Sequence, residues 1–402
     1  MKDHRQIGQE LELFFISDQV GPGLPLWLPK GALIRRELER YMTDLELAEG
    51  YKHVITPHLA KVDLYKTSGH WEHYREEMFP VMKRDNEEYV LRPMNCPHHI
   101  QIYKMRPRSY RELPLRIAEF GTNYRFEHSG ELSGLIRVRS MTLNDAHIFC
   151  TPEQLKEEFK KAVKLIEKVY KDLDLQNFWF RLSLHDPKDK NKYVDNPKLW
   201  KISEQALRDA LEDLKVHYKE GVGEAAFYGP KLDVQIPNAL GKDETVSTVQ
   251  IDFLLPERFN LTYVGENGKE KQTVMIHRGI ISTLERMTGF LLERYQGALP
   301  TWLSPIQAKI IPITDRNNDY AQKVFKQLMN ANVRVELDDR SEKMQAKIRE
   351  AQLQKIPYML LIGDREEKEK SVSIRKRSGE DLGAKKIESF LKDLLDEVAQ
   401  RL

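Results

Sequence analysis

The sequence is poor in cysteine, has almost no excess of either charge, and contains no long apolar run. Cys96 and Cys150 are the only cysteines among 402 residues, which excludes a disulfide-stapled fold and fits a reducing cytosolic compartment. Lys and Arg total 64 against 62 for Asp and Glu, so a nucleic acid would have to bind a local basic surface. The N-terminus carries no apolar signal segment, and no apolar run approaches the roughly 18 residues of a membrane span. We therefore expect a soluble, cytoplasmic protein that does not bind a membrane.

Length and composition predict a globular chain of two domains. Hydrophobic residues make up 40% of the sequence and charged residues 31%, which allows a sizeable core beneath a solvated surface. The segment 299–305, which begins Leu-Pro and ends Ser-Pro, interrupts the pattern of helices and strands. We place a domain boundary there, between a larger domain over residues 1–303 and a smaller one over residues 304–402.

Apolar periodicity predicts an α+β fold. In the larger domain we expect helices and strands over the ranges 31–48 (helix), 51–55, 113–124 and 135–149 (strands), 152–173 and 198–215 (helices), 231–236, 246–253 and 272–277 (strands), and 279–295 (helix). The hairpin-like connections favour a mostly antiparallel sheet. The smaller domain alternates strands with helices, which is typical of a small α/β domain with a largely parallel sheet; its elements are 309–313, 318–330, 333–337, 342–354, 358–362 and 384–400.

Ionisable side chains recur on one face of the strand predicted over residues 135–149. Alternate positions of a strand share a face, so the odd positions Arg137, Arg139, Leu143, Asp145 and His147 should lie together. The preceding strand brings Arg125 and Glu127 to its end. For any single Arg–Glu pair we favour an ordinary solvated ion pair. For the whole set we favour a site for a polyanion, because burying so many ions without a ligand is costly.

Two further features are ambiguous from the residues alone. Gly279, Ser282, Thr283 and Arg286 would form one stripe of the predicted helix, which fits close helix packing and ligand approach equally well. Three dispersed residues, Cys96, His147 and His277, could bind zinc, although an isolated cysteine or histidine is more often an ordinary buried side chain. Cys150 is excluded as a fourth ligand because, three residues from His147 on a strand, it should face the other way.

Several longer segments carry a resemblance to a known family. They are Lys30–Pro57, Ser68-Gly69-His70-Trp71, Arg92-Pro93-Met94-Asn95-Cys96-Pro97, Pro114–Phe149 with Tyr124-Arg125-Phe126-Glu127 and Arg137-Val138-Arg139, Asn144–Phe149, Phe227-Tyr228-Gly229-Pro230-Lys231, and His277–Arg286. Together they resemble threonyl-tRNA synthetases, a family of class II aminoacyl-tRNA synthetases, over essentially the whole chain. The motifs are long and diverse, so a chance match is excluded in practice.

The resemblance implies a fold, an activity and partners. The expected fold is an antiparallel sheet flanked by helices (residues 1–303), followed by a small α/β anticodon-binding domain (304–402), in a homodimer. The expected activity is a threonine–tRNA ligase that activates L-threonine with ATP and transfers it to tRNA(Thr). The expected cofactors are one Zn²⁺ per chain and Mg²⁺ with ATP. The family's N-terminal editing region has no counterpart here, so we expect no editing in cis.

The resemblance also assigns roles by position. The implied nucleotide contacts are Arg125, Glu127, Arg137 and Arg286; the implied catalytic residues are Arg125, Arg286 and His70; the substrate contacts are Asp145, Tyr228, Lys231 and Gln250; the zinc ligands are Cys96, His147 and His277; and the anticodon contacts are Glu366 and Arg375. The chain departs from the family pattern at Ser140 and Ala225, where glycine is usual, at Val246-Ser247, and at Leu143, where some members carry glutamine.

Two other functions remain open at this point. A catalytically silent relative that binds or regulates tRNA would share the fold, although the presence of Arg125, Arg286 and the three metal-ligating residues argues against it. A related ligase for serine or proline would share the nucleotide-binding motifs. The set Cys96, His147 and His277 favours threonine.

Overall fold

The computed structural model describes residues 2–190, 192–238 and 241–401. It divides the chain into two compact units, one formed by Met1–Phe15, Leu26–Leu38 and Leu291–Leu402, the other by Ile16–Pro25 and Glu39–Phe290. The predicted boundary between residues 303 and 304 stays a prediction. Among the described residues, no helix has the length and apolar character to cross a membrane.

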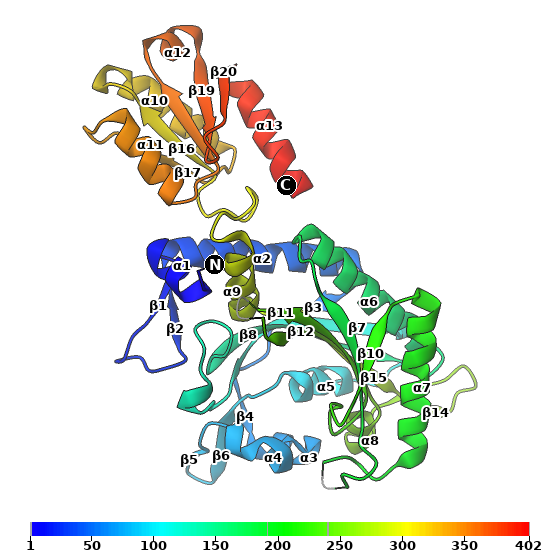
Figure 1. The fold of residues 1–402 in the computed structure, drawn as a ribbon. Coiled ribbons are helices and arrows are strands. Elements are labelled where there is room, and N and C mark those ends of the chain that lie inside the picture. Colours follow the sequence, from blue (N-terminus) through cyan, green and yellow to red (C-terminus); the bar gives the residue numbers. More distant parts are fainter. Residues whose placement is uncertain (1, 191, 239–240, 402) are drawn as a thin grey trace. The chain divides into compact units, whose positions relative to one another are not determined.

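The second unit is built on one large sheet (Figure 1). Its strands run in the order β10 (Tyr218–Val222), β9 (Trp179–Leu184), β11 (Lys231–Pro237), β12 (Asp243–Asp252), β15 (Val274–Thr283), β8 (Ser140–Cys150), β7 (Leu115–Tyr124) and β3 (Lys52–His53). All pairs from β9 to β7 are antiparallel, whereas the outer pairs β10–β9 and β3–β7 are parallel. This confirms the mostly antiparallel sheet.

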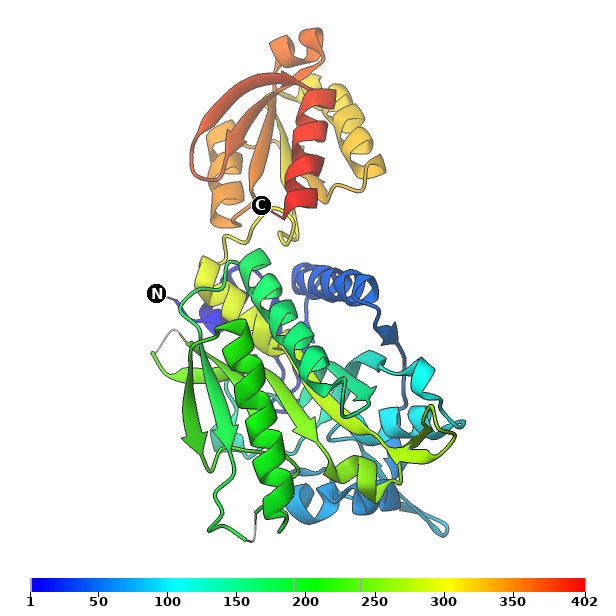
Figure 2. The same cartoon turned by 90° about the vertical axis from the view of Figure 1, so that its right-hand side faces the viewer.

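Helices cover both faces of this sheet. On one face, α6 (Leu155–Asp172) contacts β8, β12, β15 and α7 (Pro197–Leu214), and α6 and α7 lie side by side in Figures 1 and 2. The buried side chains of α6 recur every three or four residues, at Phe159, Val163, Ile166 and Tyr170, so one apolar stripe meets the sheet. On the opposite face, α5 (Cys96–Lys104) packs against Ile117, Phe149 and Met275.

Smaller elements complete this unit at one end of the sheet. They are the three strands β4 (Leu59–Lys61), β6 (Glu87–Leu91) and β5 (Met82–Arg84), the helices α3 (Val62–Ser68), α4 (His70–Tyr74) and α8 (Leu254–Arg258), and the hairpin of β13 (Thr262–Val264) and β14 (Glu270–Gln272). The helix α2 (Pro29–Ala48) agrees with the predicted helix 31–48, whereas the strand predicted over 51–55 is only the two residues of β3.

Two of the predicted elements are wrong in ways that affect the site. The strand predicted from residue 135 begins at Ser140, and Arg137 belongs to a turn closed by a bridge to Ser133. Arg137 and Arg139 therefore do not lie on the strand face with Asp145 and His147. Leu135 and Ile136 are buried, so the apolar run that suggested a strand is core packing of a loop.

The helix predicted from residue 279 begins at Leu284 as α9 (Leu284–Tyr295). The preceding residues continue β15, and the register shifts between Gly279 and Thr283, where Ser282 has a φ of 56°. The stripe of Gly279, Ser282, Thr283 and Arg286 is therefore not helical. Ile280 and Ile281 explain the difference, because both are fully buried and β-branched residues suit a central strand.

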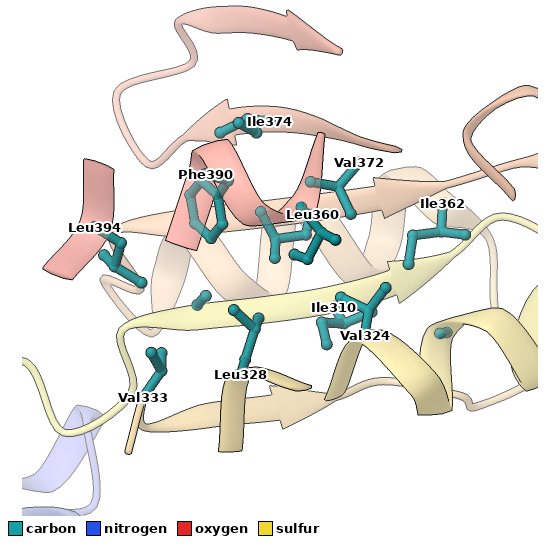
Figure 3. Packing of buried hydrophobic residues seen from close by; sticks show 13 residues of the cluster. Ile310, Val324, Leu328, Val333, Leu360, Ile362, Val372, Ile374, Phe390 and Leu394 are labelled. Atoms are coloured by element: carbon teal, nitrogen blue, oxygen red, sulfur yellow. The ribbon is translucent and has the colours of Figure 1, made fainter. Parts of the chain in front are cut away.

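The first unit contains a smaller sheet in the order β17 (Val335–Leu337), β16 (Ala308–Pro312), β18 (Tyr358–Ile362), β19 (Ser371–Lys376) and β20 (Asp381–Lys386). Only the pairs of β16 are parallel, whereas β18–β19 and β19–β20 are antiparallel. The expectation of a largely parallel sheet is thus corrected. Figure 3 shows its core, in which Ile310, Leu360 and Val372 of the strands meet side chains of α10 (Asn318–Asn330) and α13 (Ile387–Gln400). The same unit also contains α11 (Met344–Leu353), α12 (Asp364–Glu369), α1 (His4–Glu10) and parts of the first hairpin, β1 (Phe14–Ile16) with β2 (Pro25–Trp27).

Candidate active site and metal centre

Three side chains from distant parts of the sequence converge between α5 and the sheet. His147 of β8 lies directly opposite His277 of β15 in the strand register, and their ring centroids are 4.7 Å apart. Cys96 is the first residue of α5. One ligand atom from each of the three residues lies within 4.8 Å of those of the other two, and all three residues are buried. This group could hold a metal ion.

The donor set fits zinc. One thiol and two imidazoles are ligands that Zn²⁺ prefers, and three protein ligands leave a coordination position for a further ligand. Burial, followed by the approach of His277 and His99, holds the pKa of His147 well below its usual range, so its imidazole is neutral and available as a ligand. Burial, followed by the carboxylates of Asp145 and Asp252, raises the pKa of the Cys96 thiol.

Each histidine of this group has its second nitrogen engaged by a further side chain. His277 Nε2 lies 2.7 Å from Asp252 Oδ2. The other oxygen of Asp252 accepts two backbone N–H groups at the start of α8, which hold the carboxylate in place. His147 Nδ1 lies 2.8 Å from His99 Nδ1. Sequence reasoning missed both partners. Asp252 follows Gln250 by two residues on one strand, and His99 follows Cys96 by one helical turn, so their spacing was a usable signal.

Two residues predicted to bind the substrate, Lys231 and Gln250, form a row across four strands with the two histidines predicted to bind zinc. Lys231 pairs with Gln250, Gln250 with His277, and His277 with His147. Residues directly opposite each other on neighbouring strands point to the same face, so these four side chains lie beside one another. Tyr228 donates a hydrogen bond of 2.7 Å to Gln250 Oε1, and its ring centroid lies 5.1 Å from that of His277.

Asp145 lies next to this row, two residues before His147 on the same face of β8. Its Oδ2 accepts a 3.0 Å hydrogen bond from Asn95 Nδ2. Across the strand pair it faces Gly279, where an added Cβ would meet no heavy atom closer than 3.6 Å. Gly279 therefore leaves space for at least one atom beside the acidic side chain of Asp145.

The arginines predicted to bind the nucleotide gather around Arg286. Its guanidinium donates to the backbone carbonyls of Ile136, at 3.0 Å, and Thr245, at 2.9 Å. Burial lowers the pKa of Arg286, and the neighbouring guanidiniums of Arg125 and Arg137 contribute to the lowering. Cations that repel one another in a partly buried place are stabilised by an anionic ligand.

Glu127 and Arg137 contact each other directly. Arg137 Nε lies 2.8 Å from Glu127 Oε2, but Glu127 is buried, so the pair is not the solvated ion pair that we favoured for any single Arg–Glu pair. Both residues line an open cavity of about 590 Å³, together with Trp71, Phe126 and His128. A cavity of this size is large enough for a nucleotide or for the end of a nucleic acid strand.

His70 lies beside the metal-ligating group rather than on an open surface. Its side chain is fully buried, with Nδ1 2.7 Å from Ser68 Oγ and Nε2 3.7 Å from Cys96 Sγ. Burial lowers the pKa of His70 to about 3, so its imidazole is neutral.

The two residues predicted to contact the anticodon lie in the smaller domain, and neither is buried. Glu366 is in the first turn of α12 and accepts the backbone N–H of Gly363 at 2.9 Å. Arg375 is on β19, 3.5 Å from Asp381.

The departures from the family pattern are accommodated locally. Ser140 begins β8 opposite Tyr124, and Leu143 lies opposite Gly121 and Thr283. Ala225 is buried in a small cluster with Tyr193 and Trp200. Val246 is buried, and Ser247 receives a 2.6 Å hydrogen-bond contact from the Tyr170 hydroxyl.

Comparison with known proteins agrees with the motifs and the fold. The family described as tRNA synthetase class II core domain (G, H, P, S and T) matches residues 74–295, and the family described as anticodon binding domain matches residues 307–397. The chain belongs to the class II tRNA synthetases. Its larger match covers the metal-ligating group, the strand row and the arginine cluster.

The similar proteins reported below are all named for the same amino acid, threonine. The chain is 58% identical over 401 residues to the threonine–tRNA ligase of Geobacillus kaustophilus (strain HTA426), a match that covers 100% of this chain and 62% of that protein. The threonine–tRNA ligase of Streptococcus suis (strain 05ZYH33) is also 58% identical, over 402 residues. The crystal structure of the RNA binding domain of threonyl-tRNA synthetase from Cryptosporidium parvum Iowa II matches with a TM-score of 0.94 at 38% identity, over 98% of each chain. The chain spans less than two thirds of the length of the two threonine–tRNA ligases from Geobacillus kaustophilus and Streptococcus suis.

Proposed function

We propose that this chain is a threonine–tRNA ligase, which activates L-threonine with ATP and transfers it to tRNA(Thr) in the cytoplasm. The observation that carries this proposal is the convergence of Cys96, His147 and His277 beside the row that ends in Gln250 and Lys231. A metal with an open position next to polar side chains can recognise a small amino acid that bears a hydroxyl group. The relatives that are 58% identical bear the same name.

We propose one Zn²⁺ per chain, held by Cys96, His147 and His277. When bound, the metal supplies a Lewis-acidic contact for the amino and hydroxyl groups of threonine. Asp145 is proposed to accept a hydrogen bond from the substrate amino group, because its carboxylate lies on the same strand face as His147. Tyr228 and Gln250 form one wall of this space through their hydrogen bond. Lys231, whose Nζ lies 3.0 Å from Asp233, brings a cation to the end of the row.

The arginine cluster is proposed to bind ATP. Arg125 and Arg286 are proposed to neutralise the negative charge that develops at the α-phosphate when the threonine carboxylate displaces pyrophosphate. Glu127 and Arg137 line the adjoining cavity and are proposed to contact the rest of the nucleotide. Mg²⁺ is expected to accompany ATP, since it bridges phosphate oxygens. His70 is proposed to act when the tRNA ribose attacks the adenylate, which requires it to become accessible from its buried position.

The tRNA and a second copy of the chain are the proposed macromolecular partners. Glu366 and Arg375 are proposed to contact anticodon bases, whose edges are accessible in an unstacked loop. The homodimer is proposed to form at the edge of the large sheet. There β3 is a short edge strand, and the side chains of Leu47 and Ile55 on either side of it are 53% and 97% exposed.

Amino-acid-dependent ATP–pyrophosphate exchange tests the proposal. We expect exchange with threonine to exceed that with valine by ~10⁴-fold or more, because valine lacks the hydroxyl that the metal would hold. Serine keeps the hydroxyl and should be only ~10–200-fold poorer. Exchange driven best by serine or proline would assign the chain to another ligase of the same class. No exchange with any amino acid would identify a silent relative.

A further inference from the structure

His99 and Glu119 form a chain of hydrogen bonds that ends on one of the three metal-ligating residues. His99 Nδ1 lies 2.8 Å from His147 Nδ1, and His99 Nε2 lies 3.1 Å from Glu119 Oε2. All three side chains are buried. His99 is on α5, one turn after Cys96, whereas Glu119 is on β7 and His147 on β8. The first turn of α5 therefore carries the metal-ligating residue Cys96 and also His99, which contacts the metal-ligating residue His147.

Glu119 is a fixed, negatively charged end of this chain. It accepts the backbone N–H of Thr56 at 2.9 Å and the Thr56 hydroxyl at 2.8 Å, and it lies 3.3 Å from the buried guanidinium of Arg92. Burial alone would raise its pKa, but the contacts with His99, Thr56 and Arg92 lower the pKa of Glu119 to about 2. An ionised carboxylate has only acceptor sites, so His99 Nε2 must be the donor in the bond to Glu119.

The tautomers of both histidines follow from that bond together with metal ligation. A His147 that binds a metal through its Nε2 lone pair carries its one proton on Nδ1, which donates to His99 Nδ1. His99 Nδ1 is then the acceptor, and its proton lies on Nε2, the nitrogen that donates to Glu119. We propose that His99 and Glu119 are positioning residues that set the tautomer and the ring orientation of His147 for Zn²⁺. This inference rests on the zinc site proposed above.

A different role for His99 would be direct ligation of the metal. Its spacing from Cys96, two intervening residues, is common among zinc ligands. Both of its nitrogens are engaged, however, one by His147 and the other by Glu119. His277 shows the simpler form of the same arrangement, in which Asp252 contacts its Nε2 directly. Carboxylates that orient metal-bound histidines in this way change metal affinity by roughly 10–100-fold when removed.

Amide substitutions at His99 can separate its two hydrogen bonds. The amide of asparagine occupies the place of the imidazole Nδ1, so His99→Asn keeps an acceptor for His147 but loses Glu119. The longer glutamine places its amide near Nε2, so His99→Gln keeps Glu119 but leaves His147 without its acceptor. His99→Phe removes both bonds. The matched control is His98→Phe, the same substitution at the neighbouring histidine of α5, whose ring packs against Tyr65 and which hydrogen-bonds the backbone of Leu59.

The experiment measures the dissociation constant for Zn²⁺ by competition with a chelating dye, and the visible absorption spectrum of the Co²⁺-substituted protein, on the full chain. We expect His99→Gln and His99→Phe to bind Zn²⁺ roughly 10–100-fold more weakly than wild type, with an altered Co²⁺ spectrum. His99→Asn should remain within a few fold of wild type, and His98→Phe should be unchanged.

The outcomes separate the two proposals. Wild-type protein that binds no Zn²⁺ would overturn the zinc site itself. If the wild-type protein binds Zn²⁺, and His99→Asn and His99→Gln bind it with equal affinity, the positioning role alone is overturned. That comparison decides the question even if His99→Phe does not fold. A Co²⁺ spectrum that indicates one protein ligand fewer in every His99 variant would show that His99 binds the metal directly. That result would also overturn the positioning role.

Discussion

Replacing Glu46 by glutamine should strongly destabilise the unit that contains the larger sheet. Glu46 of α2 lies 2.6 Å from Arg278 Nη2, and both side chains are 0% exposed. Asn144 donates a 2.8 Å hydrogen bond to the same carboxylate, and His53 Nε2 lies 2.8 Å from its other oxygen. Glu46→Gln keeps the shape but leaves the Arg278 guanidinium buried without a counter-charge.

The expected loss is roughly 3–5 kcal/mol in the free energy of unfolding, the usual cost of removing one partner of a fully buried ion pair. For a unit of this size the loss corresponds to a melting temperature lower by roughly 6–20 °C. Asp63→Asn is the matched control, because Asp63 pairs with Lys66 at 3.1 Å on the exposed face of α3 and the pair should contribute less than about 1 kcal/mol.

The same pair gives the stability a dependence on pH. Burial opposes ionisation of Glu46, but the attraction of Arg278, with smaller contributions from His53 and Asn144, brings the pKa of Glu46 below its ordinary value of 4.5. Because the folded state holds this carboxylate ionised more strongly than the unfolded state does, its contribution is fully present above pH 4.5. The contribution is lost as the pH falls through the lower, folded-state pKa. The difference between wild type and Glu46→Gln should therefore shrink in acid.

Calorimetry and urea unfolding of the full chain, at pH 7 and in steps below pH 4.5, measure both effects. Since the chain has two compact units, only the transition of the unit that contains Glu46 should move. A loss below 1 kcal/mol at pH 7, or a difference from wild type that persists in acid, would show that the attraction between Glu46 and Arg278 does not outweigh the cost of burying them.

Three further predictions concern the proposed activity. Arg125→Ala and Arg286→Ala should each lower threonine-dependent ATP–pyrophosphate exchange by roughly 10²-fold or more, the scale of one lost electrostatic contact to the transition state; a rate near that of wild type would mean the nucleotide binds elsewhere. Cys96→Ser should lose bound zinc and threonine activation together, because a hydroxyl is a poor zinc ligand, and metal analysis that finds active, zinc-free protein would contradict this. Tyr228→Phe removes the hydrogen bond to Gln250 and should raise the KM for threonine by roughly 2–10-fold with little change in melting temperature; an unchanged KM would place threonine away from this wall.

The sequence predicted the central strands of the large sheet because they have strong local signals, but it missed β9 and β10 at one edge. The central strands mix apolar and β-branched residues with polar ones, and alternation on β8 correctly placed Asp145 and His147 on one face. The same reasoning failed for Arg137 and Arg139, because the apolar side chains of Leu135 and Ile136 are buried in a loop rather than a strand. Burial in a loop and burial in a strand look alike over a few residues.

The metal-ligating group could not be predicted from spacing. Cys96, His147 and His277 are separated by about 50 and 130 residues, and their meeting depends on the register of β8 with β15 and on the packing of α5. Only the resemblance to a family indicated them. The hairpin of β19 and β20 was also missed, because β20 is polar and largely exposed and so lacks a periodic signal. The roles assigned to the individual site residues stay predictions.

The buried ion pair of Glu46 and Arg278 lies on one face of strands β8 and β15, and the candidate metal site lies on the other face. Asn144, which contacts Glu46, immediately precedes Asp145, and Arg278 immediately follows His277. Successive residues of a strand point to opposite faces, so Glu46 contacts Asn144 and Arg278 on the face of the sheet opposite the site. A slip of one residue between β8 and β15 would turn the Arg278 side chain into the site and separate His147 from His277. The cost of moving Arg278 away from Glu46 opposes that slip. The buried charges therefore favour the one register in which the metal-ligating residues meet.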